Sequence, residues 1–340
     1  MKKFKKFRES LTKIIGIIII FLIISNFIPR PFMVTSPGIA QELSPLITVK
    51  DGYKGTSSGD FMLTAVSSKK ASLLDLIYIS IFDPKGYDIA PMNQQIPEGM
   101  EMDEYISIMS ALMEESKIKA QAVALKEAGY KIDLKESGSG AEVVQVIEGG
   151  SAEGKLKSGD VIIAVDGQKV ELATDAVNLI REKEVGEEVN ITVKRENEKK
   201  NFSLKTVELD SQPDKPSIGV LIITRNLSYN FPRETNFNTE NIVGPSAGGM
   251  FTLEIYNQLI KEDITKGKKI AGTGTISSDG SIGMIDGVLQ KIIAADKADA
   301  DIFLVPEGNY EEAKKTDRDI KLVMVKNIDD ALKYLKEEVK

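Results

Sequence analysis

The sequence predicts an α/β (α+β) chain of more than one domain that follows a single membrane-spanning helix. Three observations lead to this prediction. Strand-like and helical segments alternate over the last third of the chain, the middle third is rich in short strands and turns, and residues 14–28 carry no charge. The chain has 340 residues, 42% of them hydrophobic and 28% charged, which is enough for two or three domains.

The uncharged run follows a basic tail, residues 1–13, in which Glu9 is the only acidic residue. The run is short for a span of about 20 residues, but Lys13 and Arg30 can extend to the two membrane interfaces. No small-residue cleavage site follows it. We therefore expect a single-pass cell-membrane protein with an uncleaved signal anchor at 14–29, a cytoplasmic N-terminus and extracytoplasmic domains. A buried core helix is the alternative.

The segments that follow the anchor are less regular. Prolines at three positions predict an extended linker over 30–45. The run ASLLDLIYISIF at 71–82 is apolar enough for a helix that packs in a core or contacts a membrane surface. A long helix is expected over 102–128, where Gly129 ends it.

The middle unit, 130–210, contains GAEVVQVIEGG, then SGDVIIAVDGQ, then a helical run near Ala176–Ile180. This pattern resembles a PDZ domain of the bacterial protease type. The resemblance implies that an extended peptide binds as an added strand, beside the helix and under the loop around Ser137–Gly140. A purely structural spacer is the alternative.

The residue types that are absent limit the chemistry. The chain has no histidine and no cysteine, so Ser-His-Asp triads, thiolate nucleophiles and His-ligated zinc are excluded. We expect neither a metal nor a cofactor. The net charge of −7 argues against a nucleic-acid partner. Gly149, Gly154 and Lys155 have phosphate-loop spacing, but Leu156 stands where a magnesium-binding Ser or Thr belongs, so no nucleotide is expected.

Ser246 stands where a tight turn leads into a helix. Gly244 and Pro245 precede it, Ala247 follows, and apolar residues recur at helical spacing from Met250 onward. Backbone amides at such a helix start carry partial positive charge and are suited to hold a developing oxyanion. An ordinary N-cap serine is the alternative, and this segment alone favours it.

Lys291 is the candidate base that an enzyme without histidine would need. It follows Ser246 by 45 residues and lies in the first turn of a predicted helix, among Ile285, Val288 and Ile292. To accept a proton, its pKa of ~10.4 has to fall by several units, and burial among apolar neighbours has that effect. On spacing alone, a surface lysine is the alternative.

Two motifs carry a resemblance to a known family. GPSAG at 244–248 and the run from Thr273 to Lys291 resemble, in order and without gaps, the serine and lysine motifs of the Lon (S16-type) proteolytic domain. The whole chain is similar to the membrane-anchored, PDZ-containing Lon-like proteases of the SepM type, which process a secreted peptide pheromone. Asp286 departs from the pattern, because a glycine is common there.

The resemblance implies roles for three residues: Ser246 as nucleophile, Lys291 as general base, and Thr273 as a hydroxyl that orients the lysine amine. Backbone amides near Gly244, Pro245 and Ala247 are the candidates for the oxyanion hole. Since the chain has no Walker motif, we expect an ATP-independent serine endopeptidase that cleaves secreted peptides or unfolded protein segments.

The resemblance also implies a domain layout. Residues 46–128 and 216–340 would form one discontinuous protease domain, with the PDZ unit inserted between them. Two rival hypotheses stay open. One is a catalytically inactive PDZ adaptor that binds peptides at the membrane, and the other is a membrane-surface scaffold with a serine N-cap.

Overall fold

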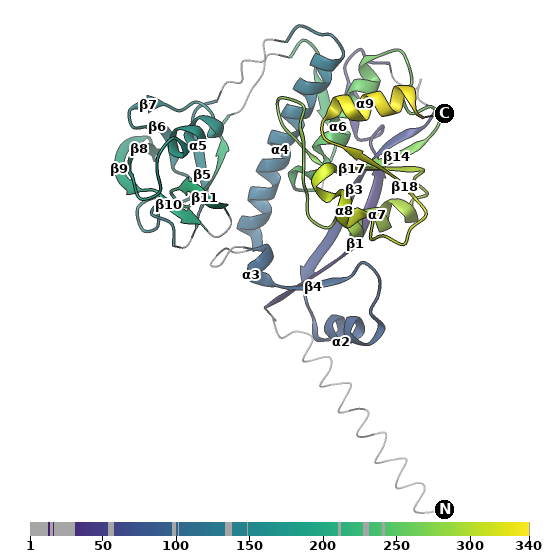
Figure 1. The fold of residues 1–340 in the computed structure, drawn as a ribbon, viewed down its shortest axis with the longest axis horizontal. Coiled ribbons are helices and arrows are strands. Elements are labelled where there is room, and N and C mark those ends of the chain that lie inside the picture. The colour runs from purple at the N-terminus through teal and green to yellow at the C-terminus, as the bar shows by residue number, and fades with distance from the viewer. Residues whose placement is uncertain are drawn as a thin grey trace, which may run out of the picture.

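The larger unit is built on a mixed six-stranded sheet in the order β18-β17-β14-β3-β1-β4 (Figure 1). Its strands are β1 (Phe32–Glu42), β3 (Asp60–Lys70), β4 (Asp88–Pro91), β14 (Lys269–Gly272), β17 (Ile302–Pro306) and β18 (Lys321–Val325). β1 pairs antiparallel with β3 and β4, whereas β14 pairs parallel with β3 and β17. The sheet therefore joins segments from both sides of the middle third of the chain.

The larger unit has helices on both faces of this sheet. Its described helices are α2 (Leu73–Phe82), α3 (Met92–Gln95), α4 (Met102–Glu127), α6 (Gly248–Leu259), α7 (Val288–Lys297), α8 (Tyr310–Ala313) and α9 (Ile328–Glu337), of which α2 lies beyond the end of the sheet (Figure 1). Side chains alternate across a strand, so Phe61 of β3 belongs to the cluster around α6, and its neighbour Met62 belongs to the cluster around α7. α6 and α7 thus lie on opposite faces.

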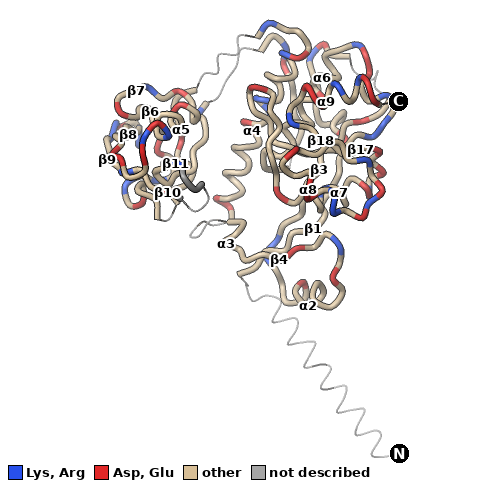
Figure 2. Tube along the Cα trace, in the orientation of Figure 1, with Lys and Arg blue, Asp and Glu red and all other residues tan. Residues whose placement is uncertain are grey.

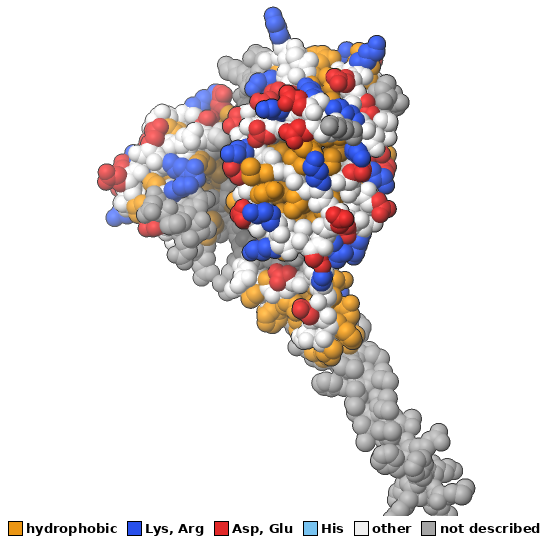
Figure 3. All heavy atoms as spheres, turned by 45° about the vertical axis from the view of Figure 1, so that its right-hand side comes forward, with side chains coloured by type: hydrophobic (Ala, Val, Ile, Leu, Met, Phe, Trp, Pro, Cys, Tyr) orange, Lys and Arg blue, Asp and Glu red, His pale blue; other side chains and the backbone are white. Residues whose placement is uncertain are grey.

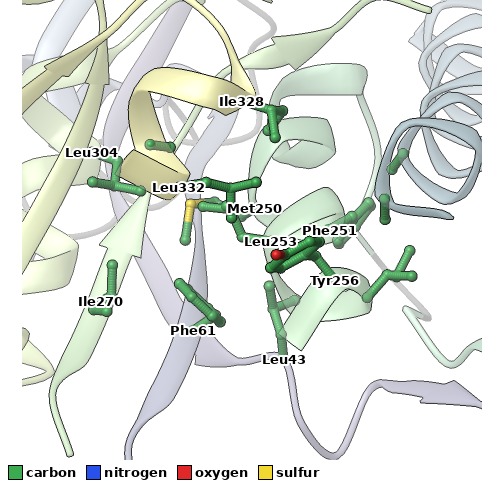
Figure 4. Packing of buried hydrophobic residues seen from close by; sticks show 14 of the residues in the cluster. Leu43, Phe61, Met250, Phe251, Leu253, Tyr256, Ile270, Leu304, Ile328 and Leu332 are labelled. Atoms are coloured by element: carbon green, nitrogen blue, oxygen red, sulfur yellow. The ribbon is translucent and has the colours of Figure 1, made fainter. Parts of the chain in front are cut away.

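Helix α6 is the central helix of the larger unit. All twelve of its residues are buried. Figure 4 shows Met250, Phe251, Leu253 and Tyr256 of α6 in one cluster with side chains from the sheet and from α9. A helix that is buried on every side has a fixed position, and the chain that enters it is therefore held rigidly.

The smaller unit has a sheet in the order β12-β5-β6-β8-β9, with β7 on β6. Its elements are β5 (Ala141–Val146), β6 (Val161–Val165), β7 (Gln168–Lys169), α5 (Ala173–Arg181), β8 (Glu188–Arg195), β9 (Glu198–Lys205) and β12 (Val220–Thr224). Its core is separate from that of the larger unit. The remaining described strands are short and form three two-stranded sheets: β2 (Ile47–Val49) with β13 (Thr235–Phe237), β10 (Val207–Leu209) with β11 (Gln212–Ser217), and β15 (Thr275–Ile276) with β16 (Ile282–Gly283).

The linker expected over 30–45 is wrong for most of its length, because β1 occupies residues 32–42. Met33 and Val34 are buried in the sheet. Pro37 is tolerated because the pairing of β1 with β3 shifts register between Pro37 and Ala40, where the ladder of hydrogen bonds is interrupted.

The boundary expected at residue 216 also differs from the structure. β12, which the sequence assigns to the protease domain, pairs antiparallel with β5 and completes the sheet of the smaller unit. Val220 and Ile222 pack on the core of that unit. A strand pattern predicts that a segment is extended, but it does not predict which sheet takes it up.

The structure, a computed structural model, describes residues 31–53, 58–96, 100, 102–132, 138–147, 149–209, 212–226, 231–239 and 242–339, with Lys13 and Gly16. Apart from those two residues, the expected tail 1–13 and anchor 14–29 lie outside this part. Within the described ranges, no helix combines the length and apolar content that a membrane crossing requires.

Two expected helices can be compared with the structure. α4 ends at Glu127, and Gly129 follows with a φ of +83°, in agreement with the expected helix over 102–128. α2 forms within 71–82, but none of its residues is buried. The expectation of a core helix at α2 is therefore wrong, and the alternative, contact with a membrane surface, stays a prediction.

Candidate active site

Ser246 lies in a 3-10 turn, η1 (Pro245–Ala247), that runs directly into α6. Gly244 precedes the turn with a φ of +94°, a conformation that favours glycine. Ser246 is not the N-cap of α6, since Ala247 holds that position and no side chain makes a cap hydrogen bond there. The structure therefore differs from the N-cap alternative, and the half-buried hydroxyl is left for other chemistry.

Small residues let a second loop approach the serine turn closely. The amide of Gly274 donates to the carbonyl of Ser246 over 2.7 Å, and the amide of Gly249 donates to the carbonyl of Gly274 over 3.0 Å. A Cβ on Gly248 would lie 2.5 Å from Ser116 Oγ, so this position has no room for a side chain. The motif thus fixes the backbone around the hydroxyl.

The second loop and α7 bring the other two predicted residues to the serine. Lys291 Nζ lies 2.8 Å from Ser246 Oγ and 3.0 Å from Thr273 Oγ1. The Thr273 hydroxyl donates to the carbonyl of Ser246 over 3.0 Å. Because its proton is used in this way, the threonine oxygen accepts from the lysine amine and holds it in place.

Lys291 is buried, with 3% of its surface exposed. Burial lowers the pKa of Lys291 to about 8, because an ammonium ion is poorly solvated there, and the negative charge of Asp286 opposes this shift. An amine with such a pKa is partly neutral near pH 7. The arrangement is therefore able to remove a proton from the Ser246 hydroxyl.

An apolar pocket of about 450 Å³ opens beside Ser246. Its apolar lining comes from both units: Val66, Met100, Ile108, Met109, Leu112, Leu221, Met284 and Ile285. α4 contributes side chains between Tyr105 and Leu112, a stretch that carries no charged residue and is tan in Figure 2. The pocket is therefore suited to an apolar side chain of a ligand.

Two groups of pocket residues escaped the sequence analysis. Leu221 of β12 reaches the pocket from the smaller unit, and no local pattern predicts that packing. The pocket methionines Met100 and Met109 had a signal that could have been used, because they belong to a set of five methionines within about twenty residues, together with Met92, Met102 and Met113. Flexible, polarisable methionine is common on surfaces that bind varied apolar ligands.

Among the residues that the structure describes, no three acidic side chains converge in a way that could hold a metal ion. The side chains brought together at the site are the hydroxyl of Ser246, the amine of Lys291 and the hydroxyl of Thr273.

Comparison with known proteins identifies two segments. Residues 129–206 match the PDZ domain family, and residues 241–337 match the Lon protease (S16) C-terminal proteolytic domain. The Lon protease of Trichlorobacter lovleyi is 34% identical over 99 residues, which are 28% of this chain and 12% of that protein. A probable periplasmic serine endoprotease DegP-like of Bartonella henselae is 35% identical over 89 residues, 26% of this chain and 17% of that protein.

Solved structures match the same PDZ segment. The PDZ domain of an SdrC-like protein from Listeria innocua is 34% identical and covers 24% of this chain and 92% of its own, with a TM-score of 0.23. Its counterpart from Listeria monocytogenes is 26% identical, with coverage of 25% and 87% and a TM-score of 0.23.

The matched region is less than a fifth of the length of the two curated relatives. The two family matches show that the chain contains a PDZ domain and a Lon-type (S16) C-terminal proteolytic domain. This combination supports a serine protease.

Proposed function

We propose that this protein is a membrane-anchored, ATP-independent serine endopeptidase of the SepM type, with Ser246 as nucleophile and Lys291 as general base. The observation that carries the proposal is the position of the buried Lys291 amine, 2.8 Å from the Ser246 hydroxyl oxygen. With a pKa of about 8, roughly one amine in ten is neutral at pH 7.

The chemistry proceeds through an acyl-enzyme. Ser246 Oγ attacks the scissile carbonyl carbon while its proton moves to neutral Lys291. The C–N bond of the tetrahedral intermediate then breaks, the leaving amine takes the proton from the Lys291 ammonium, and an ester remains on Ser246. Water attacks this ester and gives a proton to Lys291. Ser246 regains that proton as the carboxylic acid product leaves.

Thr273 acts as a positioning residue in this scheme. Its hydroxyl accepts one N–H of the amine and donates to the Ser246 carbonyl, so the nitrogen lone pair is directed toward the serine. Of the expected oxyanion candidates, Gly244 uses its amide on the Met109 carbonyl over 3.0 Å and Pro245 has no N–H, so the donors we propose are the amides of Ser246 and Ala247. They lie in the first turn, ahead of the first intrahelical hydrogen bond, from the amide of Gly248 to the carbonyl of Pro245.

The substrates we propose are secreted peptides, a peptide pheromone among them, or unfolded segments with an apolar residue at the cleavage site. The apolar pocket beside Ser246 supports that preference. β12 forms an edge of the PDZ sheet next to α5, where the amide of Ala173 donates to Thr224 Oγ1 over 3.0 Å. A peptide added to β12 would lie close to the pocket, because Leu221 of the same strand lines it.

The extracytoplasmic location rests on the sequence. The basic tail 1–13 and the uncharged run that follows it favour a cytoplasmic N-terminus and a folded part outside the cell. Short secreted peptides need no ATP-driven unfolding, and this fits a protease unit without a Walker motif.

The test is cleavage of an unfolded protein and of a peptide with one apolar cleavage site by purified variants. Ser246→Ala and Lys291→Ala should each lower the rate by roughly 10³-fold or more. Lys297→Ala, which changes an exposed lysine of the same helix, should keep full activity. Circular dichroism and a thermal melt check that each variant is folded.

Full activity of folded Lys291→Ala would contradict the dyad. A wild-type protein that binds the peptide tightly but never cleaves it would instead be the PDZ adaptor.

A further inference from the structure

Helix α2 exposes apolar side chains that the described part of the chain leaves uncovered. Its sequence is LLDLIYISIF, in which Asp75 is the only charged residue, and none of the ten residues is buried. Ile81 and Phe82 are 67% and 68% exposed. The α2 surface consists of Leu74, Ile77, Tyr78, Ile81, Phe82 and the neighbouring Tyr87. Figure 3 shows hydrophobic side chains gathered on the lobe that α2 occupies in Figure 1.

Such a helix differs from ordinary surface helices. A helix that is apolar on nearly every side is normally buried in protein or lipid. Ten residues of helix are about 15 Å long, whereas the hydrocarbon core of a bilayer is about 30 Å thick. α2 is therefore too short to cross a membrane, but it is long enough to lie along its interface.

The helix is held in a defined conformation. Ser72 and Asp75 form a capping box at its N-terminus, and Lys69 Nζ lies 2.7 Å from Asp75 Oδ1. Tyr78 packs against Phe82 and Tyr87, with ring centroids 5.3 Å and 6.2 Å apart. The exposed apolar face thus belongs to a capped and packed element.

The position of α2 in the chain indicates what covers it. The amide of Ala71, directly before the helix, donates to the carbonyl of Phe32 over 2.8 Å. The uncharged run 14–28 ends four residues before Phe32, and four residues span at most about 14 Å. If that run is in a bilayer, α2 starts close to the surface where the chain leaves it. So short a tether gives a high effective concentration of lipid.

We propose that the α2 surface docks onto the outer interface of a phospholipid bilayer. The inference depends on the proposed anchor for its tether, but not on the Ser246–Lys291 chemistry. The rings of Tyr78, Phe82 and Tyr87 are of the kind that concentrates at membrane interfaces. Lys70, exposed at the end of β3, suits anionic head groups. With the anchor, this contact fixes the orientation of the protease unit relative to the membrane.

The experiment uses the full chain, which contains no tryptophan. Phe82→Trp introduces a single fluorophore into the α2 surface, and Val185→Trp places one on an exposed turn of the PDZ unit as a control. Each variant is reconstituted into mixed phosphatidylcholine and phosphatidylglycerol vesicles, with or without bromine on the acyl chains. Flotation measures membrane association, and cleavage of the peptide substrate is measured separately.

Emission from the vesicle-bound Phe82→Trp variant should shift to shorter wavelength and lose roughly half of its intensity in brominated vesicles. Emission from the Val185→Trp variant should not change. An unquenched signal from floating Phe82→Trp would overturn the proposal and leave the anchor intact. If the emission of Phe82→Trp shifts to shorter wavelength but is not quenched, the α2 surface is covered by a second copy of the chain and not by lipid. If the protein does not float with the vesicles, both the docking and the anchor are wrong. The cleavage assay tests the proposed catalysis independently of this result.

Discussion

In the proposed dyad, Lys291 determines the pH dependence of cleavage. Its folded-state pKa of about 8 is lower than its ordinary value, so the fraction of neutral, active amine grows as pH rises toward 8. We predict that kcat/KM rises about tenfold per pH unit below this pKa and becomes constant above it. The measurement is peptide cleavage from about pH 6 to about pH 10. A rate that stays constant across this range would contradict Lys291 as the base.

We expect Asp286 to tune that profile, since its charge raises the pKa of Lys291 against the effect of burial. Asp286→Asn removes the charge, and the pKa of Lys291 should fall further. The pH–rate profile should then move to lower pH, with more activity at pH 7. Asp299→Asn, which changes an exposed acid beyond the end of α7, is the control and should leave the profile in place. A shift to higher pH would rule out this role for Asp286.

Glu254 is a buried acid of α6 that the proposed chemistry does not use. Burial raises its pKa to about 7, although Gln258 Nε2 donates to its carboxylate over 2.6 Å. The folded state therefore keeps a proton that the unfolded chain releases between about pH 4.5 and pH 7, so the free energy of unfolding falls as pH rises through this window. The loss amounts to about 3 kcal/mol.

Glu254→Gln should remove this fall, and Glu262→Gln, an exposed acid just after α6, should preserve it. Urea unfolding at several pH values provides the measurement. If wild type and Glu254→Gln have the same pH dependence of stability, the acid is already ionised in the folded state.

At the scale of elements, β1 is the strand that stands where the sequence predicts a linker, and its packing can be tested by mutation. Met33 is 3% exposed and packs with Ile96, Met100 and Ile108, whereas Ile39 of the same strand is 51% exposed. Met33→Ala should lower the free energy of unfolding by about 2–5 kcal/mol through lost burial and a cavity. Ile39→Ala should cost less than about 0.5 kcal/mol. If urea titration shows that both substitutions change the free energy of unfolding equally and only slightly, residues 32–42 behave as a linker and not as a strand of the sheet.

The elements differ in how well sequence predicts them. α4 was predictable because its apolar pattern is long and Gly129 marks its end. β1 was not, since three prolines suggested a linker and the interrupted pairing that accommodates Pro37 exists only in the folded sheet. Likewise, the apolar sequence of α2 was recognisable, but its exposure depends on how the whole chain folds.

The candidate site was more predictable than the fold around it. Each of Ser246, Thr273 and Lys291 lies in a short motif with strict local geometry, and hydrogen bonds join all three. The pocket that would select the substrate is assembled from α4, β12 and the loop before α7, far apart in sequence. Because these segments meet only in the folded chain, no local sequence pattern predicts that they line one pocket.

At the scale of the whole molecule, the shared sheet predicts how the chain unfolds. β3 pairs with β14 although some 200 residues separate them, so neither part can form the sheet alone. In native-state hydrogen exchange, amides of β3 and β14 should become exposed in one step. Those of β6 and β8 should respond separately, because the PDZ unit has its own core. Release of 46–128 by limited proteolysis as an independently folded piece would contradict this arrangement.

The most direct test of the proposed dyad is covalent labelling of Ser246 by a fluorophosphonate probe, located by mass spectrometry of the digested protein. We predict that the label is found on Ser246 and that its rate rises with pH toward an apparent pKa near 8. We also predict that labelling is lost in Lys291→Ala and retained in Lys297→Ala. Labelling of a different serine, or labelling of Ser246 at an unchanged rate in Lys291→Ala, would contradict the account.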